Sequence, residues 1–178
     1  MAIETTRRQL LITPLVLCAA ACRKTEPDLS AFTEEEPPHL SSLIHVADPL
    51  VASQLLSGWH QVEQNAWRWT ARNFAAVLRP PPGSGNLGAT LQFRLAVPDA
   101  VIKQLKFVTL SGSVPGLRLS PETYRQPGEA VYARDIPPGI LSGDSVRVDF
   151  ALDKAIPPSQ GDGRELGVIA FSLGLETK

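Results

Sequence analysis

The chain has 178 residues, of which 43% are hydrophobic and 20% charged, and its net charge is −1. This balance excludes a wholly disordered chain and a protein with several membrane spans. From Val46 onward there are 13 basic and 12 acidic residues. No concentrated basic face is therefore expected, and nucleic acid is not an expected partner.

Residues 1–21 have the three parts of a secretory signal. Arg7 and Arg8 form a positive start, a twelve-residue apolar run follows from Leu10 to Ala21, and small residues close it. The apolar run is shorter than the ~20 residues that span a bilayer, and Pro14 interrupts it. We therefore predict a signal peptide rather than a transmembrane anchor.

Two stretches of this signal resemble bacterial export patterns. The stretch Thr6-Arg7-Arg8-Gln9-Leu10-Leu11 resembles a twin-arginine signal, which implies export of a folded protein, with ordinary Sec export as the alternative. The stretch Ala19-Ala20-Ala21-Cys22 resembles a lipobox. The second resemblance implies a lipid on Cys22 that anchors the protein at the periplasmic face of the bacterial cell envelope, since several acyl chains anchor stably. The alternative is simple cleavage, which releases a soluble protein.

Residues 22–45 are polar and acidic, with three consecutive glutamates at positions 34–36 followed by two prolines. Like charges repel and proline resists helix formation, so this segment is predicted to be a disordered linker. The folded domain is predicted to begin at Val46 and to extend to residue 178. Its first part, residues 48–58, fits either a short helix capped by Asp48 or a first strand.

An apolar period of two runs through the rest of the chain. Alternation is clearest at residues 89–97, 146–152 and 169–175, as in strands that bury one face and expose the other. Residues 101–110 and 129–136 are further predicted strands. Sixteen prolines and thirteen glycines, placed mostly between these runs, mark turns. The predicted fold is all-β, a jelly-roll-like antiparallel β-sandwich after a signal peptide and disordered linker.

Two short motifs carry many of the polar and aromatic residues. One runs Gly58-Trp59, then Glu63, then Arg68-Trp69-Thr70, and the other is Asp162-Gly163-Arg164-Glu165-Leu166-Gly167. Together they resemble a small β-sandwich module of bacterial glycan-related proteins that is often appended to glycosyltransferases. The resemblance covers Trp59 to the end of the chain and implies a sandwich fold and a link to glycans.

The candidate ligand-binding residues lie in and beside these motifs. Aromatic rings stack on sugars, while charged and amide groups bind sugar hydroxyls; on this ground the candidates are His60, Glu63, Trp67, Arg68 and Arg164. A turn is predicted at Gln64-Asn65. Glu63 is expected to pair with either Arg68 or Arg164, more as a structural ion pair than a catalytic one. The other two tryptophans, at positions 59 and 69, are expected in the core.

Nothing in the sequence forms a recognisable catalytic set. Ser111-Gly112-Ser113 lacks the first glycine of a nucleophile elbow, and the three histidines do not have metal-ligand spacing. Glu63 and Asp162 are available carboxylates, but nothing sets them apart as a hydrolytic pair. We therefore expect a non-catalytic protein without metal or cofactor, whose partner is a glycan. The alternative is a structural lipoprotein that docks another envelope protein.

Overall fold

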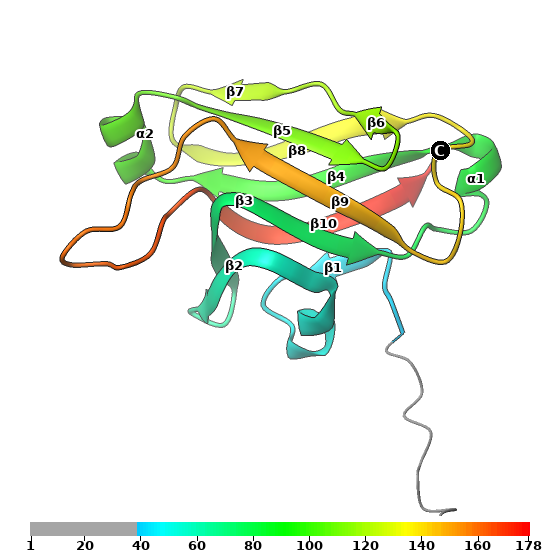
Figure 1. Ribbon diagram of the computed structural model, residues 1–178, viewed down its shortest axis with the longest axis horizontal. Coiled ribbons are helices and arrows are strands. Elements are labelled where there is room, and N and C mark those ends of the chain that lie inside the picture. Colours follow the sequence, from blue (N-terminus) through cyan, green and yellow to red (C-terminus); the bar gives the residue numbers. More distant parts are fainter. Residues whose placement is uncertain (1–38) are drawn as a thin grey trace, which may run out of the picture. The chain divides into compact units, whose positions relative to one another are not determined.

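Antiparallel strands make up half of residues 39–178, the part of the chain that the computed structural model describes (Figure 1). The predicted signal peptide, the lipid site at Cys22 and most of the acidic linker lie outside the described residues and stay predictions. Within residues 39–178, no helix has the length and apolar character needed to cross a membrane.

The strands form two layers with the core between them. One layer contains, in spatial order, β1 (Leu43–His45), β10 (Ile169–Thr177), β4 (Ala89–Val97) and β8 (Gly128–Ile136). The other contains β2 (Leu55–Glu63), β3 (Trp67–Leu78), β9 (Val146–Leu152) and β5 (Val108–Val114), with the short β6 (Leu117–Arg118) and β7 (Glu122–Tyr124) on β5. A short pairing of β3 with β10 joins the layers at one corner.

Successive long strands alternate between the two layers, from β3 through β4, β5, β8 and β9 to β10. Figure 1 shows the layers lying one behind the other, with the short helices α1 (Ser84–Leu87) and α2 (Asp99–Leu105) at opposite ends. This crossing back and forth is the jelly-roll-like arrangement predicted from the alternating strands, and the all-β antiparallel sandwich is confirmed.

Aromatic rings from both layers meet in the middle of the core. Phe150 stacks on Phe74 with ring centroids 5.0 Å apart, and lies 5.1 Å from Phe93 of the opposite layer. Tyr132 closes the cluster with its ring edge against Phe150 at 6.2 Å. These four side chains are buried. Ring pairs of this kind add to the free energy gained by removing apolar area from water.

The strands predicted at residues 89–97 and 146–152 have the observed bounds, while β10 extends two residues beyond 175 and β8 starts one residue before 129. The strand predicted over 101–110 is wrong in its first half, where α2 forms instead. Pro98 precedes this helix, and Asp99 pairs with Lys103 one turn later. Val101 is buried and Leu105 packs against the core, so spacing of four positions, not two, organises this segment.

The domain begins before the predicted boundary at Val46. Leu43–His45 pair with β10 because Ile44 is fully buried there, so the end of the predicted linker is part of the sheet. The ambiguous segment 48–58 contains both predicted forms. A 3₁₀ helix, η2 (Pro49–Gln54), is capped by the Asp48 carboxylate and leads directly into β2.

Candidate ligand-binding groove

The two sequence motifs meet at the hairpin between β2 and β3. The predicted turn at Gln64-Asn65 is confirmed, since both residues have positive φ and Ala66 N–H donates to the Glu63 carbonyl at 3.1 Å. Positive φ at both central positions is the pattern of a type I′ turn, whose twist matches that of the flanking strands. The loop that carries Asp162 and Arg164 packs beside this hairpin.

Arg164 is the partner of Glu63. Its Nη1 donates to Glu63 Oε1 at 2.8 Å, while Nε donates to Asp162 Oδ1 at 3.0 Å and Nη2 donates to Asp162 Oδ2 at 2.9 Å. Arg164 lowers the pKa of Asp162 to about 2, chiefly through the side-chain hydrogen bond, and the two acids raise the pKa of Arg164. Of the two predicted pairings, the structure therefore contains Glu63–Arg164, as an ion-pair cluster that joins the loop to the hairpin.

His60 and Arg68 also have partners within the chain. His60 Nε2 lies 2.7 Å from the Glu165 carbonyl oxygen. Arg68 donates from Nε to the Val46 carbonyl at 2.6 Å and from Nη1 to the His60 carbonyl at 2.9 Å. Burial lowers the pKa of Arg68. Arg68 thus does not pair with Glu63, and instead joins β3 to β2 and to the segment after β1.

The end of the second motif lies against the first. Gly167 N–H donates to the Thr70 carbonyl at 2.7 Å, and Val168 N–H donates to Thr70 Oγ1 at 3.1 Å. A Cβ on Gly167 would approach Thr70 Oγ1 to 2.7 Å and the Ala71 carbonyl oxygen to 2.9 Å. The spacing of the two motifs is therefore explained by packing, because the chain can approach this closely only with glycine at position 167.

The three tryptophans lie on this hairpin with different neighbours. Trp59 packs edge-on against Phe74 and Phe93, while Nε1 donates to the Ala75 carbonyl, so its predicted place in the core is confirmed. Trp69 also packs against the core, as predicted. Trp67 is half-buried, with its ring 6.3 Å from that of Trp69. The structure does not test the predicted ligand contact by Trp67, and the variant Trp67→Ala does so.

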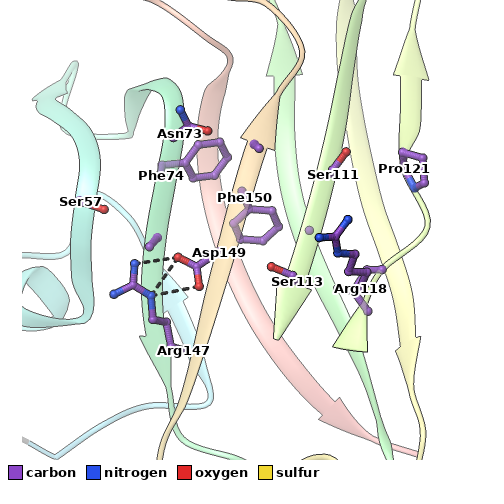
Figure 2. A pocket seen from close by; sticks show the side chains of 14 residues that line it. Ser57, Asn73, Phe74, Ser111, Ser113, Arg118, Pro121, Arg147, Asp149 and Phe150 are labelled. Carbon is purple, nitrogen blue, oxygen red and sulfur yellow. Dashed lines mark hydrogen bonds and ion pairs between the residues drawn. The ribbon is translucent and has the colours of Figure 1, made fainter. Parts of the chain in front are cut away.

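A separate groove of about 590 Å³ crosses the outward face of the second layer (Figure 2). Directly opposed residues on antiparallel strands project from the same face. Two such rows line the groove: Ser57, Ala75, Asp149, Ser113 and Arg118 in one, and Asn73, Ala151 and Ser111 in the other. Phe74 and Phe150 alternate with these residues and project into the core, where they are 2% and 3% exposed.

The floor of the groove is low because its side chains are small. Serine and alanine predominate along the rows, and the segment after β6, with Leu119 and Pro121, forms one side. The aromatic rings in the lining are buried, so they offer no exposed face for stacking. A ligand in this groove would instead meet hydroxyl, amide, carboxylate and guanidinium groups, as Figure 2 shows.

Charge in the groove is concentrated in three side chains. Arg147 and Asp149, both on β9, form a forked ion pair, with Arg147 Nε 2.9 and 3.0 Å from the two carboxylate oxygens and Nη2 2.7 Å from Oδ1. The hydrogen bond to Asp149 raises the pKa of Arg147. Arg118 lies opposite Ser113 and is directed over β5 in Figure 2. Among residues 39–178 it has no ion-pair partner.

None of the five residues predicted to bind a ligand lines this groove. The sequence contained part of the signal, since Arg147 and Asp149 occupy the polar positions of the predicted strand 146–152. It did not show that β3, β5 and β9 are neighbours, which is what gathers serines and charges from distant segments onto one face.

The class of protein defined by this structure is an antiparallel β-sandwich with a polar groove on one sheet. No family model matches the chain, and no curated protein matches its sequence. Solved structures with some similarity include the acetyl xylan esterase Est2A from the rumen bacterium Butyrivibrio proteoclasticus, at 8% identity and a TM-score of 0.42 over 78% of this chain. Dimeric latent PorU from Porphyromonas gingivalis has 12% identity and a TM-score of 0.34 over 60% of this chain.

A third solved structure, described as "CBM4 structure and function", has 10% identity and a TM-score of 0.35. The similarity covers 82% of this chain and 91% of that solved structure. The chain spans only 32% of the esterase and 10% of PorU. These identities and TM-scores are too low to transfer a ligand or an activity to this chain.

Proposed function

We propose that this domain binds carbohydrate without catalysing a reaction, that the groove on the second layer is the binding site, and that a lipid on Cys22 holds the protein at the bacterial envelope. The observation that carries the proposal is the pair of rows of short polar side chains across an outward sheet face.

Carbohydrate matches the chemistry of these rows. A sugar offers hydroxyl groups that both donate and accept hydrogen bonds, and serine hydroxyls, the Asn73 amide and the Asp149 carboxylate satisfy both roles. Small floor residues allow a ring to approach the sheet closely. The groove volume of about 590 Å³ lies within the usual range for small-ligand sites, ~300–1,000 Å³.

The lining supports binding rather than hydrolysis. Glycoside hydrolysis ordinarily uses two carboxyl groups, one as acid and one as base or nucleophile. Asp149 is the one carboxylate in the described lining, and both of its oxygens are engaged by Arg147. His60 lies on the hairpin with the Glu165 carbonyl and is not in the lining.

A change on the groove floor tests the proposal. Ala151 is exposed on β9 between Asn73 and Ser111, so Ala151→Leu fills the floor without removing a polar group. We expect the purified chain to bind at least one oligosaccharide on a glycan array, and Ala151→Leu to weaken that binding at least tenfold in a calorimetric titration, about 1.4 kcal/mol.

Two controls distinguish the groove from other surfaces. Ala133→Leu makes the same change at an exposed alanine on β8, outside the groove, and should leave binding unchanged. Trp67→Ala should also retain binding, with circular dichroism confirming that each variant is folded. Loss of binding in Trp67→Ala but not in Ala151→Leu would place the site on the hairpin instead. No binding to any glycan would reject the carbohydrate proposal.

A further inference from the structure

The three charged side chains of the groove, Arg118, Arg147 and Asp149, carry a net positive charge. Arg147 and Asp149 neutralise each other through contacts of 2.7 to 3.0 Å. Arg118 remains as a lone cation, because no carboxylate within residues 39–178 forms an ion pair with it. Glu122, the acid nearest to it along the following segment, is paired with Arg134 at 2.9 Å.

Arg118 lines the groove, where a bound ligand would reach it. It lies opposite Ser113 in the β5–β6 register, and Ser113 lies opposite Asp149 on β9. Two strand spacings separate Asp149 from Arg118, which is ~10 Å across the sheet. Ser111 and Ser113 lie on the strand between them. The groove therefore presents a neutral ion pair, then serine hydroxyl groups, and then an uncompensated guanidinium.

We propose that the groove selects an acidic glycan, one whose sugar rings carry carboxylates, and that Arg118 binds the carboxylate. This inference rests on the proposed function and names the ligand class of the same site. A guanidinium presents its N–H groups in a planar fork that matches a carboxylate, and such charge-assisted hydrogen bonds are about twice as strong as neutral ones. The serines beside Arg118 would take the hydroxyl groups of the same ring.

The test uses pairs of glycans that differ only in charge. Oligomers of galacturonic, glucuronic and mannuronic acid are arrayed beside the same oligomers with their carboxyl groups reduced to alcohols, together with sulfated and neutral glycans. We expect the best ligand to be a uronate oligomer. Its reduced counterpart should bind with an affinity at least about tenfold lower. Binding of the uronate should also weaken as salt rises, since an exposed ion pair is screened.

Arg118→Gln should remove the preference for the uronate, so that the uronate oligomer and its reduced counterpart bind with similar affinity. Arg125→Gln makes the same change of charge outside the groove, at an exposed arginine over the Phe107 ring, and should keep the preference. A neutral or sulfated glycan as the best ligand, or a preference that survives Arg118→Gln, would overturn this inference and leave the proposed function standing. Binding to no glycan at all would reject both.

Discussion

Replacing Phe150 by alanine is expected to lower the free energy of unfolding by about 3–5 kcal/mol, the usual loss when a buried phenylalanine is truncated. Phe150 contacts aromatic rings from both layers, with centroids 5.0 Å away at Phe74, 5.1 Å at Phe93 and 6.2 Å at Tyr132. Its removal leaves a cavity between the two layers. Strand pairing within each layer limits how far the layers can move together to fill that cavity. The substitution also removes the support beneath the groove floor, whose residues alternate with Phe150 on β9.

Urea unfolding followed by circular dichroism measures this loss as a lower midpoint at unchanged slope. Leu50→Ala is the control, because Leu50 is 87% exposed on η2 and its truncation removes little buried area. A change of under about 1 kcal/mol for Phe150→Ala would contradict a core centred on this aromatic cluster.

Gly58→Ala is expected to cost about 3 kcal/mol through two separate effects. Gly58 has φ of +74°, a conformation that costs a residue with Cβ about 1–2 kcal/mol. A Cβ there would also lie 2.1 Å from the Asn73 carbonyl oxygen and 2.7 Å from Phe74 Cα. These atoms belong to the backbone of β3, so relief requires the two strands to separate, which adds a further ~1–3 kcal/mol.

Gly139→Ala separates the two effects. Gly139 has a similar φ of +82° but no atom within 4 Å of its added Cβ. This control should lose only the conformational part, about 1–2 kcal/mol, in the same urea titration. Equal losses at the two glycines would contradict the expected steric cost of a Cβ at position 58 against the backbone of β3.

Much of the fold follows from local sequence. The alternation of Val146, Val148, Phe150 and Leu152 with polar residues fixes the face that β9 buries, and the observed burial follows it. The helix that begins at Asp99 was predicted as a strand because apolar residues at positions 101, 102 and 105 fit either period. The Asp99–Lys103 ion pair favours the helix. Ile44 was assigned to the linker because three residues in a polar stretch carry too little pattern to mark a strand.

The site was harder to predict than the fold. The sequence drew attention to clustered tryptophans and charges, and the structure shows that Glu63, Arg68 and Arg164 are held by partners within the chain. The groove instead draws Ser57, Asn73, Ser111 and Asp149 from strands that are distant in sequence. Which strands become neighbours depends on the packing of the two layers, and no local pattern contains that information.

The most direct test of the account is to map the contact surface of a bound oligosaccharide by nuclear magnetic resonance. The isotope-labelled chain is titrated with the best glycan from the array, and amide shifts are followed along the strands. We expect the largest shifts on the groove, at Ser57, Asn73, Ser111, Ser113 and Arg118. Shifts confined to the hairpin around His60, Glu63 and Trp67 would contradict a binding site on the outward face of β3, β9 and β5.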